Sequence, residues 1–321
     1  MADTNRLFRE ASPRQLQQIF AEALGEPHIH QARLLDGGLF NTTYHVTYGE
    51  AREEAVLRLG PVNWQFLMGH EENLIQSEVH ICALCERQGI PSSHVLAWDC
   101  SRRTIDRDYM IVRYIPSVPM CQAELAEEER SALHGEMGAY LRRFHQIEGD
   151  CYGFVSRILA GQGCSSWGDA LLLEAEDILD RLETHLGCNG EAIRTVFRQN
   201  RALLDAAGPP RLLHTDMWEG NVLLDRDTHD ILAVIDGDRA VYGDPDFEFA
   251  SSWMEHPSLL AGYGVDPSED ISPDRRKRRT LYRLFYALLE AYTPFEKYGD
   301  RSHCGNSIQR IKELLAELDS L

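Results

Sequence analysis

The sequence lacks any long hydrophobic run, although it is 321 residues long. No apolar stretch approaches the roughly 18 residues that a membrane-spanning helix needs. The first twelve residues, MADTNRLFREAS, also lack the apolar core of a secretory signal peptide. The two absences predict a cytoplasmic protein with no membrane partner.

Basic residues are scarce beside acidic ones. The chain has 32 Lys and Arg against 51 Asp and Glu, which gives a formal net charge of −19. A field of that sign repels nucleic acid and attracts cations, so we expect no nucleic-acid partner. Solubility alone is the commoner reason for such acidity. We interpret the basic run RRKRR at 275–279 as a solvated helix face or as salt-bridge partners of the acidic surface.

Patterns of metal, disulfide and hydrolase chemistry are also sparse. The eight Cys are scattered through a chain that is long enough to fold without disulfides. Cys82 and Cys85 form one C-x-x-C on a helical pattern, and we interpret them as small, semi-buried residues. His28 and His30 have no second pair at metal-ligand spacing. Because H-E-x-x-H and G-x-S-x-G are missing, the zinc-protease and serine-hydrolase classes have no support.

Apolar periodicity predicts an α+β protein with a small β-rich part followed by a larger, mainly helical part. The first part is expected to hold helices at 5–25 and 71–88 and strands near 34–35, 43–48, 55–59, 94–98 and 109–115. After Pro116, helices are expected at 124–147, 167–186, 190–206, 274–293 and 305–320. Short apolar strands on either side of polar turns, LLHTDMWEGNVLLD and ILAVIDGD, interrupt the second part.

The polar turns of that β insert carry the chemistry. His214, Asp216 and Asn221 form H-x-D-x-x-x-x-N, and Asp236 follows Asn221 by 15 residues. Phosphoryl transfer needs a carboxylate that orients the attacking hydroxyl and accepts its proton, and Asp216 suits this role. It also needs hard oxygen ligands for Mg²⁺, which Asn221 and Asp236 supply. His214 is then expected to pin the loop through hydrogen bonds.

Three stretches together resemble the aminoglycoside phosphotransferase and choline-kinase-like family of small-molecule kinases. They are LLDGGLFNTTYHV, LLHTDMWEGNVLLD and ILAVIDGDRAVYGDPDFEFA, and the resemblance runs from Leu34 to Ala250. It implies a two-lobed, protein-kinase-like fold with ATP between the lobes and Mg²⁺-dependent transfer of the γ-phosphate to a hydroxyl. The expected lobes are residues 1–112 and 117–321, joined by a hinge at 113–116.

The resemblance also assigns residues to the nucleotide. Arg58 in AVLRL takes the place of the strand lysine that holds the α- and β-phosphates, and Glu78 is its ion-pair partner. The hinge from Arg113 to Ile115 offers backbone groups to adenine. The expected phosphate cover consists of Gly37, Gly38, Asn41 and Thr42, although two adjacent glycines are also common in a plain hairpin turn.

The sequence departs from the family pattern at several positions. Thr215 stands where the family often has glycine, and Arg58 replaces the lysine usual in protein kinases. Glu248 stands where a later Asp is common. Asp238 adds a second carboxylate, which is either a second metal contact or an acid that faces the substrate. None of these changes removes the predicted base or the main metal ligands.

The predicted function is therefore an ATP- and Mg²⁺-dependent O-kinase of a small molecule. The alternatives are a non-catalytic nucleotide-binding protein of the same fold, or a kinase of another acceptor: a sugar, ketosamine, choline-like compound, macrolide or protein. An aminoglycoside or another amine-bearing or polyhydroxylated compound is the first guess, because a cation would suit the net charge of −19 and late acidic residues could line its pocket. These acids are Glu248, Glu255, Asp266, Glu269, Asp270 and Glu290. Trp218, inside the catalytic loop, could form a wall of that pocket.

Overall fold

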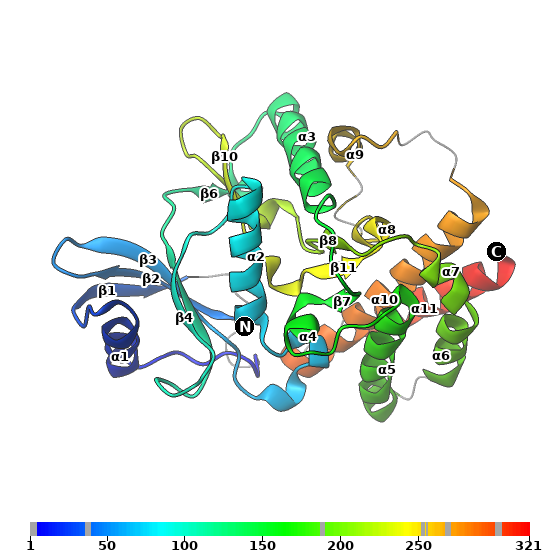
Figure 1. Ribbon diagram of the computed structural model, residues 1–321, viewed down its shortest axis with the longest axis horizontal. Coiled ribbons are helices and arrows are strands. Elements are labelled where there is room, and N and C mark those ends of the chain that lie inside the picture. Colours follow the sequence, from blue (N-terminus) through cyan, green and yellow to red (C-terminus); the bar gives the residue numbers. More distant parts are fainter. Residues whose placement is uncertain are drawn as a thin grey trace.

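The computed structural model describes residues 5–35, 40–186, 190–251, 254, 256–266, 271–298 and 304–321. Its N-terminal lobe is built on a five-stranded antiparallel sheet in the order β1-β2-β3-β5-β4, which lies on the left of Figure 1. The strands are β1 (Ile29–Leu34), β2 (Thr42–Tyr48), β3 (Glu53–Leu59), β4 (Val95–Asp99) and β5 (Tyr109–Arg113). Alternate residues of β2 are buried, as expected for a strand with one face on a core.

Helix α1 (Pro13–Leu24) packs its apolar face, which includes Ile19 and Phe20, on this sheet. The helix begins at Pro13, so the predicted start at residue 5 is wrong. The side chain of Ser12 accepts a hydrogen bond from the backbone of Gln15, and the Gln15 side chain bonds back to Ser12. This capping box, followed by proline at the first helical position, fixes where the helix starts.

Helix α2 (Leu74–Gln88) lies between the sheet and the second lobe, as Figure 1 shows. Two short 3₁₀ turns, η1 (Trp64–Phe66) and η2 (Gly69–Glu71), lead from β3 into it. The helix ends at Gly89, which adopts φ 63°, a conformation that glycine accepts without steric cost. Cys82 and Cys85 are both buried on α2, more deeply than the semi-buried positions that the sequence predicted, and burial raises the pKa of Cys85 to about 11.

The C-terminal lobe is mainly helical and carries two small sheets, in the orders β10-β9-β6 and β7-β11-β8. Its helices are α3 (Glu127–Phe144), α4 (Val155–Leu159), α5 (Trp167–Leu186), α6 (Gly190–Gln199), α7 (Arg201–Asp205), α8 (Pro245–Glu248), α9 (Pro257–Tyr263), α10 (Pro273–Tyr298) and α11 (Cys304–Ser320). Its strands are β6 (Val118–Pro119), β7 (Gly153–Phe154), β8 (Arg211–Leu213), β9 (Val222–Leu224), β10 (Ile231–Val234) and β11 (Val241–Gly243). The motif-bearing turns therefore lie between β8 and β9 and after β10.

The architecture confirms the predicted α+β fold, with differences at element ends. The helix expected at 190–206 is two helices, because the side chain of Asn200 bonds to the carbonyl of Val196 and ends α6. No helix in the described part of the chain is long and apolar enough to cross a membrane. The lobe boundaries at residues 112 and 117 stay a prediction.

Candidate active site

The loop between β8 and β9 holds Asp216 at its centre. The Asn221 side-chain amide donates to the Asp216 carbonyl at 2.8 Å and to its carboxylate at 3.0 Å. Burial, followed by the nearby charge of Asp236, raises the pKa of Asp216 to about 7. A carboxylate with a pKa near neutrality can accept a proton at the pH at which enzymes work. The two residues that the spacing predicted to act together therefore touch.

Glu248, at the end of α8, anchors this loop from behind. Its buried carboxylate accepts hydrogen bonds from the backbone N–H groups of His214 and Thr215, both at 2.8 Å. The ring of His214 is buried, which lowers its pKa, and its Nδ1 accepts a hydrogen bond from the Asp216 N–H at 3.3 Å. These are the contacts expected of a histidine that holds the loop in place by hydrogen bonds.

Thr215 adopts φ 65°, in the left-handed region that β-branched residues avoid. Its hydroxyl donates to the carbonyl of Arg239 at 2.9 Å, and its N–H is held by Glu248. These two bonds offset the steric cost of the backbone conformation. The conformation explains why glycine is common at this position in the family that the sequence resembles.

Three carboxylates gather beside the loop. Oxygen atoms of Glu78 on α2 and of Asp236 and Asp238 after β10 lie within 4.8 Å of one another. The Ile235 N–H donates to the carbonyl of Asn221 at 2.9 Å, which brings Asp236 next to the Asn221 turn. Oε2 of Glu78 is buried and has no hydrogen-bond partner among the described residues. This set of hard oxygen donors fits Mg²⁺, and the sequence pattern had not placed Glu78 in it.

Arg58 on β3 joins these carboxylates. Its guanidinium donates to Glu78, and also to Asp236 at 2.6 Å, while Asp238 lies 3.7 Å away. Burial alone would lower the pKa of Arg58, but the charges of Asp236, Glu78 and Asp238 raise it, so the guanidinium stays protonated. Burial raises the pKa of Glu78 to about 7, and burial together with Asp236 raises that of Asp238. Arg58 and Glu78 thus form the pair that the resemblance implies.

The expected contacts to the rest of the nucleotide are less complete. Gly37 and Gly38 lie outside the described residues. Asn41 is buried, and its side-chain oxygen has no hydrogen-bond partner within the described ranges. The Thr42 hydroxyl donates to the carbonyl of Arg9 at 3.2 Å, and its phosphate role stays a prediction.

At the hinge, two of the backbone groups that were expected to serve adenine are already engaged. The Arg113 N–H donates to the carbonyl of His94 at 2.9 Å, and the Ile115 carbonyl accepts a hydrogen bond from the Ser117 hydroxyl at 2.9 Å. The Arg113 N–H is therefore occupied, whereas the Ile115 carbonyl keeps a second lone pair that can accept a hydrogen bond.

A cavity of about 510 Å³ opens in front of Asp216. Its walls combine aromatic and aliphatic residues with a few polar groups. The lining residues are Met68, His70, Glu71, Phe154, Thr215, Asp216, Arg239, Phe247, Tyr286, Leu289, Glu290, Thr293, Pro294, Asn306, Ser307 and Arg310. A carboxylate with a raised pKa at the wall of such a cavity is a common arrangement of a substrate site.

The prediction of an acid-lined pocket can be checked for three of its six acids. Of the six acids proposed, Glu290 lines the cavity, whereas Glu248 is spent on the catalytic loop and Asp266 is not at the wall. Glu255, Glu269 and Asp270 lie outside the described residues. Trp218 is exposed and is not among the lining residues; its ring covers Gly220, where any Cβ would lie 2.2 Å from it.

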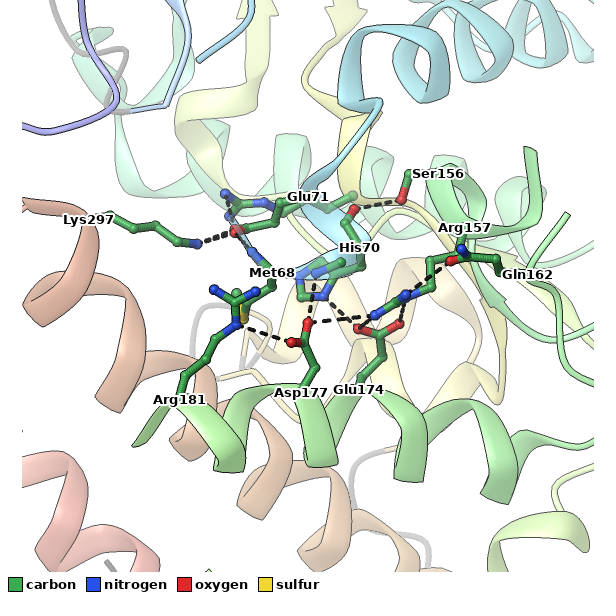
Figure 2. A network of polar contacts seen from close by, with 12 residues as sticks. Met68, His70, Glu71, Ser156, Arg157, Gln162, Glu174, Asp177, Arg181 and Lys297 are labelled. Carbon is green, nitrogen blue, oxygen red and sulfur yellow. Dashed lines mark hydrogen bonds and ion pairs between the residues drawn. The ribbon is translucent and has the colours of Figure 1, made fainter. Parts of the chain in front are cut away.

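Sequence reasoning missed the segment that forms the far wall of the cavity. Glu71, in η2, bonds to the buried ammonium of Lys297 on α10 and lies 3.3 Å from Arg239 (Figure 2). The charges of Lys297 and Arg239 outweigh the effect of burial and lower the pKa of Glu71 to about 2. Glu71 and Lys297 are 226 positions apart, and no local pattern links them.

The basic run at 275–279 has a structural role. Arg275 and Arg279 bond to the buried carboxylate of Asp246, at 2.6 and 2.8 Å, and Arg278 bonds to Asp244 at 3.3 Å. The interpretation as salt-bridge partners is confirmed for these three arginines, although their partners are buried acids and not surface ones.

Comparisons with known proteins agree with this geometry. Residues 31–281 match the model of the phosphotransferase enzyme family, which confirms the resemblance carried by the three motif stretches. A "probable ketoamine kinase" of Enterococcus faecium is 33% identical over 138 residues, which are 38% of this chain and 47% of that protein. The chain therefore spans about half the length of this relative.

Similar solved structures belong to small-molecule kinases. An aminoglycoside phosphotransferase of the APH(2") type, in complex with GDP and kanamycin, has a TM-score of 0.64 at 13% identity, covering 94% of this chain and 98% of that one. The ethanolamine kinase of Plasmodium vivax has a TM-score of 0.62 at 9% identity, covering 93% and 86%. At these identities the likeness shows the fold, which is the predicted protein-kinase-like one.

Proposed function

Because the chain belongs to the phosphotransferase enzyme family, we propose that it transfers the γ-phosphate of ATP to a hydroxyl group of a small molecule. One observation carries the proposal. The carboxylate of Asp216, with a pKa near 7, lies in the wall of a cavity and is held by Asn221 beside the Glu78, Asp236 and Asp238 carboxylates. A hydroxyl in the cavity can therefore reach both the Asp216 carboxylate, as a base, and a phosphate bound beside Arg58 and the three carboxylates.

In this proposal, Asp216 accepts the proton of the attacking hydroxyl and orients its oxygen toward the phosphate. Arg58 holds the α- and β-phosphates as a planar, permanently charged donor, and Glu78 fixes the guanidinium in place. Phosphoryl transfer needs little more than such positioning and charge stabilisation.

Asn221 and Asp236 would hold Mg²⁺, with Asp238 and Glu78 close by. The ion supplies positive charge that neutralises the phosphate oxygens as the bond to the leaving group breaks. We expect Asp236→Ala to lose the effect of Mg²⁺ on ATP binding in calorimetric titrations with and without the metal. An unchanged Mg²⁺ effect would place the metal elsewhere.

The acceptor that suits the cavity is polar and hydroxylated, has an apolar flank and carries few amines. Phe154, Phe247 and Tyr286 form a largely apolar side of the cavity. Among the lining residues in the described part of the chain, three acids stand against Arg239 and Arg310, and one of those acids, Glu71, is already paired with Lys297. A polycation such as kanamycin would find too few free carboxylates, so we no longer favour it.

The decisive experiment is ADP release from Mg-ATP with a panel of acceptors: kanamycin, hygromycin B, ethanolamine and a ketoamine made from glucose and glycine. We expect release that depends on the acceptor, and a loss of about 10²–10⁴-fold in kcat for Asp216→Asn, with ATP affinity retained. Asp227→Asn, in the exposed β9–β10 turn, is the matched control and should behave as wild type. A variant at Asp216 that keeps more than about a tenth of wild-type kcat would contradict the assignment.

Salt dependence tests the acceptor class separately. Attraction between a polycation and an acidic pocket weakens as salt shortens the screening length to about 8–10 Å, whereas capture of a neutral acceptor hardly changes. We expect kcat/KM of the best acceptor to differ by less than about twofold between low and physiological salt. A steep fall would restore the polycation hypothesis and leave the kinase assignment intact.

A further inference from the structure

His70 is a buried histidine at the cavity wall that the proposed mechanism leaves unused. It lies in η2, and its side chain is 2% exposed. Its ring stacks on that of Phe154, with centroids 4.1 Å apart and an angle of 17° between the planes. Phe154 lines the same cavity. The imidazole is therefore held flat against Phe154 in the wall of the cavity.

The two ring nitrogens of His70 have different surroundings. Nδ1 lies 2.8 Å from the carboxylate of Glu174 on α5, and Arg157 also donates to that carboxylate. A carboxylate that is already bound to arginine accepts hydrogen bonds, so Nδ1 carries the proton. Nε2 has no hydrogen-bond partner among the described residues. Because it is also not one of the fully buried polar atoms that lack a partner, it keeps some access to open space. In the neutral imidazole this leaves a lone pair on Nε2 and makes it a hydrogen-bond acceptor.

The segment that carries His70 is fixed to the C-terminal lobe on several sides (Figure 2). The Gly69 N–H donates to Asp177 at 2.7 Å, and the Ser156 hydroxyl donates to the His70 carbonyl at 2.6 Å. Glu71 is held by Lys297. A Cβ at Gly69 would lie 2.2 Å from the Arg157 guanidinium, so a side chain there would displace this arginine from Glu174. A ring held in this way is preorganised for binding, since no rotamer freedom has to be lost.

We propose that His70 recognises the acceptor by accepting, at Nε2, a hydrogen bond from a hydroxyl or ammonium group that is not the one phosphorylated. The inference rests on the proposed function and adds the chemical class of the recognised group. A carboxylate or phosphate of the acceptor at this place would face a lone pair and be rejected. The acceptor therefore has at least two donor groups: one reacts at Asp216, and the other is read by His70.

Two substitutions of His70 distinguish direct binding of the acceptor from a purely structural role. In His70→Asn the amide nitrogen can replace Nδ1 against Glu174, but the side chain no longer reaches the place of Nε2. In His70→Gln the longer amide can present an oxygen near that place. We expect His70→Asn to raise the KM and the calorimetric dissociation constant of the acceptor about tenfold, as the loss of one hydrogen bond predicts, and His70→Gln to recover part of the loss. The KM for ATP should stay unchanged in both variants.

Ser156→Ala is the matched control, because it removes an equally buried bond of the same segment without touching the cavity. It should lower the melting temperature and leave acceptor affinity alone. Acceptor affinity that is unchanged in His70→Asn, or lowered equally in Ser156→Ala, would overturn the role of His70. The probes are the four panel compounds, titrated without ATP as well as assayed with it.

The binding measurement distinguishes failure of this inference from failure of the proposed function. If every panel compound that binds wild type stays unphosphorylated, the kinase proposal is refuted, while the affinities of these compounds for His70→Asn still test His70. A compound that is phosphorylated equally well by wild type and His70→Asn refutes the role of His70 alone. If no panel compound binds or reacts, both are overturned.

Discussion

Glu248→Gln is the substitution that most directly tests how the fold holds Asp216. The two carboxylate oxygens of Glu248 each accept one backbone N–H of the catalytic loop, and the side chain is fully buried. Glutamine has one oxygen and one NH₂ group at the same two places. The new NH₂ group then faces the backbone N–H of either His214 or Thr215, at a place where the Glu248 oxygen accepted that N–H at 2.8 Å.

The expected loss follows from these contacts. A hydrogen bond to a charged group contributes about 1.5–3 kcal/mol, and a buried donor left without a partner has a comparable cost. We therefore expect the free energy of unfolding to fall by about 2–3 kcal/mol. The loop must also shift to separate the two donors, and a displacement of about 1 Å at a reacting group can cost about 10²-fold in rate.

Urea unfolding and steady-state kinetics give the two readouts. Asp246→Asn is the matched control, since Asp246 lies two residues earlier in α8, is equally buried and bonds to Arg275 and Arg279 instead of the loop. It should lose stability and keep its kcat, whereas Glu248→Gln should lose both. If Glu248→Gln keeps kcat within threefold of wild type, on the order of the scatter between preparations, the loop does not depend on this carboxylate and the reasoning fails.

Three further predictions concern neighbouring contacts. Thr215→Ala should unfold about 1 kcal/mol more easily, because it keeps the φ of 65° and loses the bond to Arg239, whereas Thr215→Gly relieves the backbone and should stay near wild type in urea unfolding. Arg58→Ala should raise the KM for ATP in initial-rate kinetics and leave the KM of the acceptor unchanged. A raised KM for the acceptor with an unchanged KM for ATP would contradict the placement of the nucleotide at Arg58. The pKa of Glu71 is lowered to about 2, so its charge adds stability that is present above the unfolded value of about 4.5 and is lost as pH falls toward 2. In urea titrations, the difference in free energy of unfolding between wild type and Glu71→Gln should therefore shrink over that pH range. A constant difference would contradict the lowered pKa.

The short-range parts of the site could be predicted from the sequence. Asp216 and Asn221 are five positions apart in one loop, so their contact follows from the loop itself. Arg58 and Glu78 lie on a strand and on the next helix, and the family resemblance links them although spacing alone would not. For Asp216 and Asn221 the motif carries its own geometry, because the few intervening residues leave little freedom.

The long-range parts could not be predicted, for a physical reason. His70 and Glu174 are 104 positions apart and meet because η2 is packed on α5, which no periodicity in either segment encodes. Helix ends that depend on one side chain, such as the break at Asn200, are equally invisible to apolar spacing. The sequence pattern therefore does not predict how η2, which connects β3 to α2, packs against α5.

The positions of the acidic residues explain why net charge alone is a weak guide to the acceptor. Glu248 holds the catalytic loop, Asp246 holds α10, and Glu174 holds His70, and all three are buried. A buried carboxylate that already accepts hydrogen bonds from its own chain has no capacity left for a cationic ligand. The charge of −19 counts such residues equally with free ones. We therefore expect acceptor recognition to depend on the few polar groups that still have an open position at the cavity, of which the proposed ones are His70 Nε2 and the Asp216 carboxylate.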